Sequence, residues 1–284
     1  MSTDISSNET NAQPDGRVLL VGCGNMGFAM LKGWIEQGTP ANRIDVVEPN
    51  DDLRKRAGGT GAKVHASVDD IIGGEAPAMA IIAVKPQVMA KVLADYRPFA
   101  AAGTTFVSVA AGTLLGTIEK ALGEGSAVIR CMPNTPAAVG KGMMVCCAND
   151  AVTGEARAVC ETLLSASGSV AFVEEESLMD AVTGVSGSGP AYVFHFIEAM
   201  AEAGVKSGLP EDLAKELAIQ TVYGAAVYAR SSDEDPGQLR SNVTSPNGTT
   251  AAALDVLMGT GRLRALLAEA VEAAAERSRE LARD

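Results

Sequence analysis

RVLLVGCGNMG, residues 17–27, is the stretch that decides the fold. Its first five residues, Arg17 to Val21, contain the apolar run typical of a buried strand, and a helical run to about Gln37 follows the turn. The glycines between them have the GxGxxG spacing: Gly22, Gly24 and Gly27. In such a turn the first glycine permits the bend, the second lets backbone approach a pyrophosphate, and the third lets helix pack on strand. The stretch predicts a dinucleotide-binding domain, in which Asn25 and Met26 begin the helix that faces the phosphates.

The end of the second predicted strand, Ile44 to Val47, bears on the choice of cofactor. Glu48 closes this strand. Its distance along the chain from Gly22 is close to the roughly 20 residues at which Rossmann proteins place an acid that binds the adenosine ribose of NAD. Asn50 follows as a further candidate ligand. Arg54 and Arg56, on the next predicted helix, could instead reach the 2′-phosphate of NADP. The residues leave the choice between NAD and NADP open.

Later strand ends add candidates, because ligands of open parallel sheets bind beyond the carboxyl ends of strands. Val- and Ile-rich runs predict strands at residues 79–84, 105–109, 128–132, 143–147 and 170–173, with a helix at 151–166. The candidate cofactor contacts at two of these ends are Ala83, Val84, Lys85, Pro86, Ala110, Ala111 and Gly112. Lys85 has the charge to contact a ribose or a phosphate. The small residues 110–112 would let the ribose and nicotinamide lie against backbone.

The chain changes character after Glu174, where the strand pattern ends. Helical segments follow at residues 190–206, 210–229, 250–257 and 262–283, with Gly208 and Gly259 as stop signals. We expect an α/β protein whose N-terminal Rossmann-type, mostly parallel sheet precedes an all-helical dimerisation domain. The expected parts are a disordered tail at 1–16, a dinucleotide-binding domain at 17–174 and a helical substrate and dimerisation domain at 175–284. Small apolar stripes on these helices need a partner surface, which favours a homodimer through this half.

Composition excludes several classes of function. The net charge of −12 argues against nucleic acid or an anionic membrane as a partner, since both select clustered Lys and Arg. No apolar run reaches the roughly 18 residues of a membrane span, and no signal peptide is evident. Five cysteines without a CxxC pair and two histidines predict no metal site and fit a cytoplasmic protein. Cys146 and Cys147 adjoin in an apolar run, so they should point to opposite faces of a strand as buried apolar residues.

Two Gly- and Ser-rich loops of the helical half each run into a predicted helix. They are VSGSGP at residues 185–190, with Ser186, Gly187 and Ser188, and SPNGTT at residues 245–250, with Gly248, Thr249 and Thr250. Both are typical of anion sites, in which backbone N–H groups at a helix start receive a carboxylate or a phosphate. Ordinary helix capping is the alternative.

The motifs together resemble those of one enzyme family. GCGNMG (22–27), AVKP (83–86), VSVAAG (107–112), RCMPNTP (130–136), DAVTGVSGSGPAY (180–192) and PGQLRSNVTSPNGTT (236–250) look like pyrroline-5-carboxylate reductase, in order over about residues 17–280. The resemblance implies reduction of 1-pyrroline-5-carboxylate to L-proline, the last step of proline synthesis, with NADPH or NADH. It also implies dimers that assemble further into rings.

The resemblance also assigns roles. It implies that backbone N–H groups of Thr249 and Thr250 bind the substrate carboxylate, that the Thr250 hydroxyl lies near the ring nitrogen, and that Asn242 contacts the cofactor. An acid before PGQL approaches that nitrogen in the family, which points to Asp233, although Glu234 and Asp235 adjoin it.

Two residues depart from the family pattern. Asn247 replaces a usual glycine and should be tolerated, because Asn accepts positive φ better than most residues. Glu48 stands where a small polar residue commonly meets the 2′-phosphate, which puts an NADPH preference in question.

Two other functions would require sequence features that differ from those of this chain. A β-hydroxyacid dehydrogenase needs a lysine early in the helical half as proton acceptor, but the first lysine there, Lys206, lies at the end of its predicted helix. A nucleotide-binding regulator without turnover would have a degraded substrate loop, whereas the loops here are intact apart from Asn247.

Hydride transfer to an iminium needs little acid catalysis, so we expect no dedicated Lys or His acid.

Overall fold

The computed structural model describes residues 16–282. Residues 1–15 of the predicted disordered tail lie outside the described part of the chain. The chain divides into two compact units, one formed by Met1–Gly187 with Ala274–Asp284 and the other by Ser188–Ala273. We refer to them as unit 1 and unit 2.

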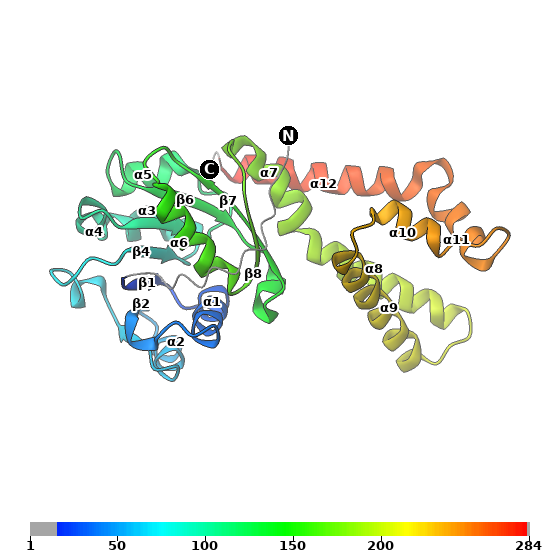
Figure 1. Ribbon diagram of the computed structural model, residues 1–284, viewed down its shortest axis with the longest axis horizontal. Helices are drawn as coiled ribbons and strands as arrows, with labels where there is room; N and C mark the ends of the chain where they lie inside the picture. The colour runs from blue at the N-terminus through cyan, green and yellow to red at the C-terminus, as the bar shows by residue number, and fades with distance from the viewer. Residues whose placement is uncertain (1–15, 283–284) are drawn as a thin grey trace. The chain divides into compact units, whose positions relative to one another are not determined.

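Unit 1 contains one sheet with the strand order β3-β2-β1-β4-β5-β6-β7-β8. Several of these strands are labelled in Figure 1. All neighbouring strands are parallel except β6 and β7, which are antiparallel. The strands are β1 (Val18–Val21), β2 (Ile44–Val47), β3 (Lys63–His65), β4 (Met79–Ile82), β5 (Thr105–Ser108), β6 (Val128–Met132), β7 (Gly142–Ala148) and β8 (Gly168–Phe172). The strand order reverses between β1 and β4, and such a switch point is where open α/β sheets bind ligands.

Helices cover both faces of this sheet, because alternate strand residues are apolar on both sides. Leu20 and Ile81 pack on the face covered by α1 (Asn25–Glu36), α2 (Asp51–Gly58) and α6 (Gly154–Ser165). Leu19 and Ile82 pack on the face covered by α3 (Pro86–Ala94), α4 (Arg97–Ala101), α5 (Leu115–Leu122) and α7 (Met179–Val182). Short 3₁₀ turns lie at Ala41–Arg43, Val68–Asp70, Thr135–Val139, Glu176–Leu178 and Gly259–Gly261. The carboxyl ends of the central strands are thereby held between two helical layers.

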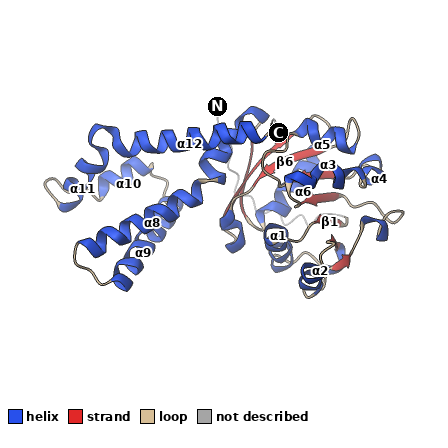
Figure 2. Ribbon diagram, turned by 180° about the vertical axis from the view of Figure 1, so that it is seen from behind, coloured by secondary structure: helices blue, strands red, loops and turns tan. Residues whose placement is uncertain are grey.

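After β8 the described chain contains helices but no strand, as Figure 2 shows. A π-helical turn at Thr183–Gly187 leads into α8 (Gly189–Lys206), which is followed by α9 (Glu211–Ser231), α10 (Pro236–Asn242), α11 (Thr249–Met258) and α12 (Arg262–Leu281). α8 and α9 pack closely, since a Cβ on Gly204 would lie 3.2 Å from the Cβ of Ala214. α12 begins in unit 2 and ends in unit 1.

The helices of unit 2 bury little apolar surface within one chain. α8 and α11 have no buried residue, and α9 buries only Ala214 and Ala218. Large apolar side chains of unit 2 that are exposed include Phe194, Phe196, Leu213, Leu217, Tyr223, Val227, Leu266 and Leu267. A hollow of about 560 Å³ is lined by side chains of α8 and α9, including Phe194. Apolar surface of this extent marks an interaction site.

The predicted fold class is confirmed, and the predicted strands agree with the observed ones to within about two residues. Cys146 and Cys147 are buried on opposite faces, as expected. β3 and α10 were not predicted. The interpretation of residues 185–190 as a loop is wrong, because residues 183–187 form a π-helical turn that continues α7 toward α8. The expected helix start is present, since α8 begins at Gly189 with Ser188 at its N-cap, but Ser186 and Gly187 belong to the helical turn before it rather than to a loop.

The buried centre of the sheet yields a stability prediction. Ile81 on β4 is fully buried, so Ile81→Ala should lower the free energy of unfolding by about 2–5 kcal/mol, because it leaves a cavity. The single tryptophan, Trp34, is buried in the same unit, and its fluorescence during urea unfolding reports the change. Ile72→Ala is the matched control: its side chain is exposed, and a loss of similar size there would contradict the argument.

Candidate active site

The glycine-rich turn after β1 lies at the switch point of the sheet. Gly22 has φ of +86°, and its N–H donates to Val47 O at 2.9 Å, while a Cβ there would meet Ala83 O at 2.8 Å. A Cβ on Gly27 would lie 2.3 Å from Gly22 O. The first and third glycines are therefore required by the fold itself, through the bend and through the close packing of α1.

Gly24 differs from its two neighbours in the motif. Its φ is −63°, and a Cβ there would meet no heavy atom within 4 Å. The open space lies at the N-terminus of α1, whose first turn carries no acidic residue and no side-chain cap. Unpaired N–H groups at such a helix start attract an anion. The turn thus has the open space and the helix start that a dinucleotide pyrophosphate needs, and binding by Gly22, Gly24, Asn25, Met26 and Gly27 stays a prediction.

The Glu48 carboxylate is held against this turn. Cys23 N donates to Glu48 Oε2 at 2.7 Å, and Asn50 N donates to Oε1 at 2.9 Å. Glu48 is 6% exposed, and its own N–H donates to His65 O at 3.0 Å. These bonds place the predicted ribose-binding acid at the carboxyl end of β2.

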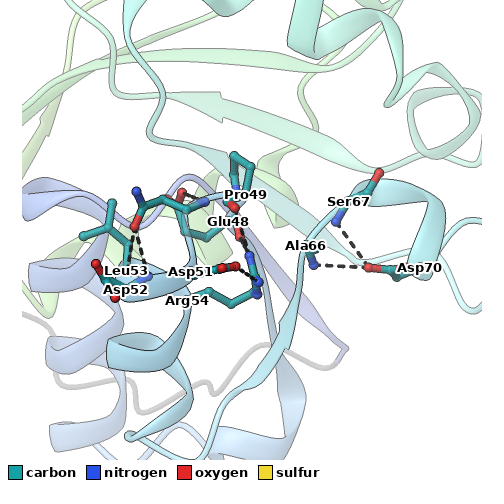
Figure 3. A network of polar contacts seen from close by, with 10 residues as sticks. Glu48, Pro49, Asp51, Asp52, Leu53, Arg54, Ala66, Ser67 and Asp70 are labelled. Atoms are coloured by element: carbon teal, nitrogen blue, oxygen red, sulfur yellow. Dashed lines mark hydrogen bonds and ion pairs between the residues drawn. The ribbon is translucent and has the colours of Figure 1, made fainter.

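Asn50 and Arg54 are both engaged within the β2–α2 connection, and Figure 3 shows Arg54 beside Glu48 and Asp51. Asn50 caps α2, because its Oδ1 accepts from Asp52 N at 3.1 Å and from Leu53 N at 3.0 Å. Arg54 Nη1 donates to Glu48 O at 2.8 Å and to Pro49 O at 3.0 Å. Its Nη2 forms an ion pair with Asp51.

Arg56 is directed at the turn itself. Its Nη2 donates to Cys23 O at 2.7 Å and to Gly24 O at 3.1 Å, and its guanidinium carbon lies 4.2 Å from the centre of the Phe28 ring.

Burial raises the pKa of the Cys23 thiol to about 11, although Arg56 acts in the opposite direction. The thiol is therefore protonated near neutral pH and fills space beneath the turn.

The other predicted strand-end residues gather at the same edge of the sheet. Ala83 follows β4, and its N–H donates to Val21 O at 2.8 Å, while Lys85 is exposed at the start of α3, with Pro86 as the first helical residue. After β5, the segment 110–112 turns at Gly112, which has φ of +76°. Because β1, β4 and β5 are adjacent and parallel, their ends form one contiguous edge.

Two polar contacts near this edge were missed by the sequence reasoning. Asn134 Oδ1 accepts from Met143 N at 2.8 Å, and its Nδ2 donates to Ser186 O at 3.2 Å and Ser186 Oγ at 3.3 Å, which joins the π-helical turn to the loop after β6. Arg130, 3% exposed, forms a 2.9 Å ion pair with Glu176. An arginine inside an apolar strand was the available signal, since a buried charge needs a partner.

The SPNGTT loop leads into α11 as predicted. Asn247 has φ of +57°, the left-handed conformation expected for it. Gly248 is the N-cap of α11, whose first turn has no acidic residue and no side-chain cap. The N–H groups of Thr249 and Thr250 therefore lie at a helix start without an intrahelical acceptor. This geometry suits a small carboxylate.

The three acids before α10 have different environments. Asp235 caps α10, because its Oδ1 accepts from Gly237 N at 2.7 Å. Glu234 Oε2 accepts from Asn242 Nδ2 at 2.9 Å, so the predicted cofactor contact Asn242 is engaged within unit 2. Asp233 is exposed and makes no hydrogen bond or ion pair with any residue between 16 and 282. Of the three carboxylates, Asp233 has no local structural role.

The fold and the glycine-rich turn define a dinucleotide-binding protein of the Rossmann type. Two family models match the chain, one described as NADP oxidoreductase coenzyme F420-dependent over residues 17–112 and one as pyrroline-5-carboxylate reductase dimerisation over residues 176–281. Pyrroline-5-carboxylate reductases of Pseudomonas aeruginosa and Synechocystis are 40% and 43% identical to it, and the alignments cover 94% and 92% of this chain and 97% of each relative. The chain belongs to the pyrroline-5-carboxylate reductase family, so the predicted family is confirmed.

Solved structures give the same result. A pyrroline-5-carboxylate reductase from Coxiella burnetii has a TM-score of 0.90 at 33% identity, with 94% of this chain and 99% of that chain covered. A pyrroline carboxylate reductase from Plasmodium falciparum, solved with NADP bound, has a TM-score of 0.81 at 29% identity, with 95% and 100% covered. Among the described helices, none combines the length and apolar character needed to cross a membrane.

The contrast between the glycines gives a prediction for the site. Gly24→Ala should cost at most about 1 kcal/mol of folding stability, because its Cβ meets no protein atom. It should weaken ADP-ribose binding tenfold or more, roughly 1.4 kcal/mol, since the Cβ occupies space that the pyrophosphate needs. Calorimetric titration and urea unfolding measure the two effects. Gly27→Ala is the comparison, and it should lower the free energy of unfolding more than Gly24→Ala does, because its Cβ would meet Gly22 O. Unchanged ADP-ribose affinity in Gly24→Ala would contradict the assignment.

Proposed function

We propose that the chain reduces 1-pyrroline-5-carboxylate to L-proline with a reduced nicotinamide dinucleotide, NADPH or NADH. The observation that carries the proposal is the match at about 40% identity over almost the whole length of pyrroline-5-carboxylate reductases. The two matching family models, over residues 17–112 and 176–281, include the glycine-rich turn and the loop before α11. The reaction would be the last step of proline synthesis, in the cytoplasm.

When bound, the reduced nicotinamide would supply a hydride to the carbon of the C=N bond, whose electron pair would move to the nitrogen. The chain would hold the dinucleotide with residues 22–27 and with the strand ends at 83–86 and 110–112. Glu48, Asn50 and Asn242 are further contacts in this proposal. The iminium form already carries its proton on nitrogen, so the residues mainly hold the ring in line.

The start of α11 would anchor the substrate. Backbone N–H groups of Thr249 and Thr250 would bind its carboxylate, with Gly248 allowing close approach. The uncapped, acid-free first turn of α11 supports this role. Ser186, Gly187 and Ser188 remain proposed contacts to the substrate, supported by the family motif rather than by a loop geometry.

Thr250 and Asp233 would act on the ring nitrogen. The Thr250 hydroxyl would accept a hydrogen bond from the protonated nitrogen or relay its proton, and the Asp233 carboxylate would favour its positive charge. Asp235 and Glu234 are engaged as a helix cap and with Asn242, which supports Asp233 as the acid that is available.

The quaternary structure is part of the same proposal. Residues 175–284 would form a homodimer through the exposed apolar faces of α8, α9 and α12, and dimers would assemble into a larger ring. Residues 17–174 would form the dinucleotide-binding domain. The dimerisation family model over residues 176–281 and the apolar exposure of unit 2 support the dimer.

The reaction is tested directly with purified protein. We expect pyrroline-5-carboxylate to cause oxidation of NADH or NADPH, followed as loss of nicotinamide absorbance, with proline as product. Small β-hydroxyacids with the oxidised cofactors should give no reduction. Activity on hydroxyacids alone would support the dehydrogenase alternative, and tight cofactor binding without turnover would support a regulator.

Thr250 provides the sharpest test of the substrate site. Thr250→Ala should lower kcat/KM for pyrroline-5-carboxylate by about tenfold to a hundredfold, because a hydrogen bond to a charged group is lost. Its dissociation constant for the reduced cofactor should stay unchanged. Thr244→Ala is the control, since the Thr244 hydroxyl donates to Arg240 O within unit 2. Steady-state constants of Thr250→Ala equal to those of the parent would remove Thr250 from the mechanism.

A further inference from the structure

We propose that Glu48 makes this chain select NADH over NADPH. The inference deepens the proposed function, but it rests only on the binding of a nicotinamide dinucleotide and not on the imine as acceptor. Two observations carry it: the fixed position of the Glu48 carboxylate, and the engagement of both nearby arginines in other contacts.

The carboxylate cannot turn away from the turn at low cost. Cys23 N and Asn50 N donate to its two oxygens at 2.7 and 2.9 Å, and Glu48 is 6% exposed. Rotation of the side chain would leave two N–H groups without acceptors in a largely buried place, and unmet buried donors are costly. Any ligand at the end of β2 therefore meets this carboxylate.

The chemistry of the carboxylate favours a hydroxyl over a phosphate. Each carboxylate oxygen offers two lone pairs and has accepted one backbone N–H, so capacity remains for the hydroxyl groups of an adenosine ribose. The acid that ends the second strand of a Rossmann sheet binds the ribose 2′-hydroxyl in this way. A 2′-phosphate brings negative charge and acceptor oxygens toward the same carboxylate, and the like charges repel.

The two arginines of α2 do not compensate for this repulsion. Arg54 spans Glu48 O and Pro49 O and pairs with Asp51, as Figure 3 shows. Arg56 donates to Cys23 O through Nη2, and its Nε is buried without a hydrogen-bond partner among residues 16–282, so solvent does not reach that nitrogen.

The start of α2 is equally unsuited to a phosphate. Asp51 and Asp52 occupy its first turn, and the Asn50 side chain accepts the N–H groups of Asp52 and Leu53. Helix N-termini bind phosphate when their N–H groups are free and no acid is near, which is the reverse of this arrangement. The Plasmodium relative was solved with NADP, so the proposal distinguishes this chain from that protein.

The test separates cofactor selection from turnover. Dissociation constants of the full-length protein for AMP and adenosine 2′,5′-bisphosphate are measured by calorimetry, and those for NADH and NADPH by nicotinamide fluorescence. We expect AMP and NADH to bind at least about tenfold tighter than their 2′-phosphorylated counterparts. kcat/KM ratios for the two cofactors with pyrroline-5-carboxylate should follow the same order.

Variants of Glu48 assign the preference to its charge. Glu48→Ser should shift the NADPH to NADH affinity ratio by about tenfold or more toward NADPH. Glu48→Gln keeps the size of the side chain and should shift the ratio in the same direction, which guards against misfolding of the serine variant. Glu36→Ser, which removes an exposed acid at the end of α1, is the matched control and should leave the ratio unchanged.

Two results overturn the proposal: tighter binding of NADPH by the parent protein, or a ratio that the folded Glu48 variants do not change. Should neither variant fold, as judged by Trp34 fluorescence, the ratio of the parent protein decides. Selective binding of AMP and NADH together with no reduction of pyrroline-5-carboxylate would contradict the proposed reaction but would still support cofactor selection by Glu48.

Discussion

The site depends on the absence of side chains where α1 meets the turn after β1. The carbonyl of Gly22 lies where a Cβ on Gly27 would be, so the first turn of α1 packs directly on the strand end. This approach aims the unpaired N–H groups of α1 at the open space beside Gly24. It also brings Cys23 N within hydrogen-bonding distance of Glu48, and so links the turn proposed for the pyrophosphate to the acid proposed for the ribose.

Much of the fold could be predicted because its signals are local. Buried parallel strands are apolar on both faces, and such runs at β1, β4 and β5 have few alternatives. Gly22, which needs a positive φ, and Gly27, which needs a close backbone contact, could also be predicted, because both belong to one short local motif. Asn247 was expected to accept a left-handed backbone and does so.

The rest depends on partners distant in sequence. β3 is three residues long, and none of them is buried, so no apolar pattern predicts it. Residues 183–187 form a helical turn in which Gly187 lies close to the Met132 side chain, which is distant in sequence, whereas Gly/Ser composition alone suggests a loop. The roles of the candidate site residues, including Thr250 and Asp233, remain predictions. Side-chain engagement within the chain, as for Glu234, became visible only in the structure.

The bare apolar faces of α8 and α9 have a consequence for how the protein works in a cell. Helices that bury almost nothing within one chain gain their stability from association, so the folded population rises with subunit concentration. In the proposed homodimer, folding and assembly would be one event. The amount of folded dimer would then fall more steeply than the amount of chain when synthesis slows. A chain damaged only in its helices would also leave an intact partner chain without its stabilising contacts.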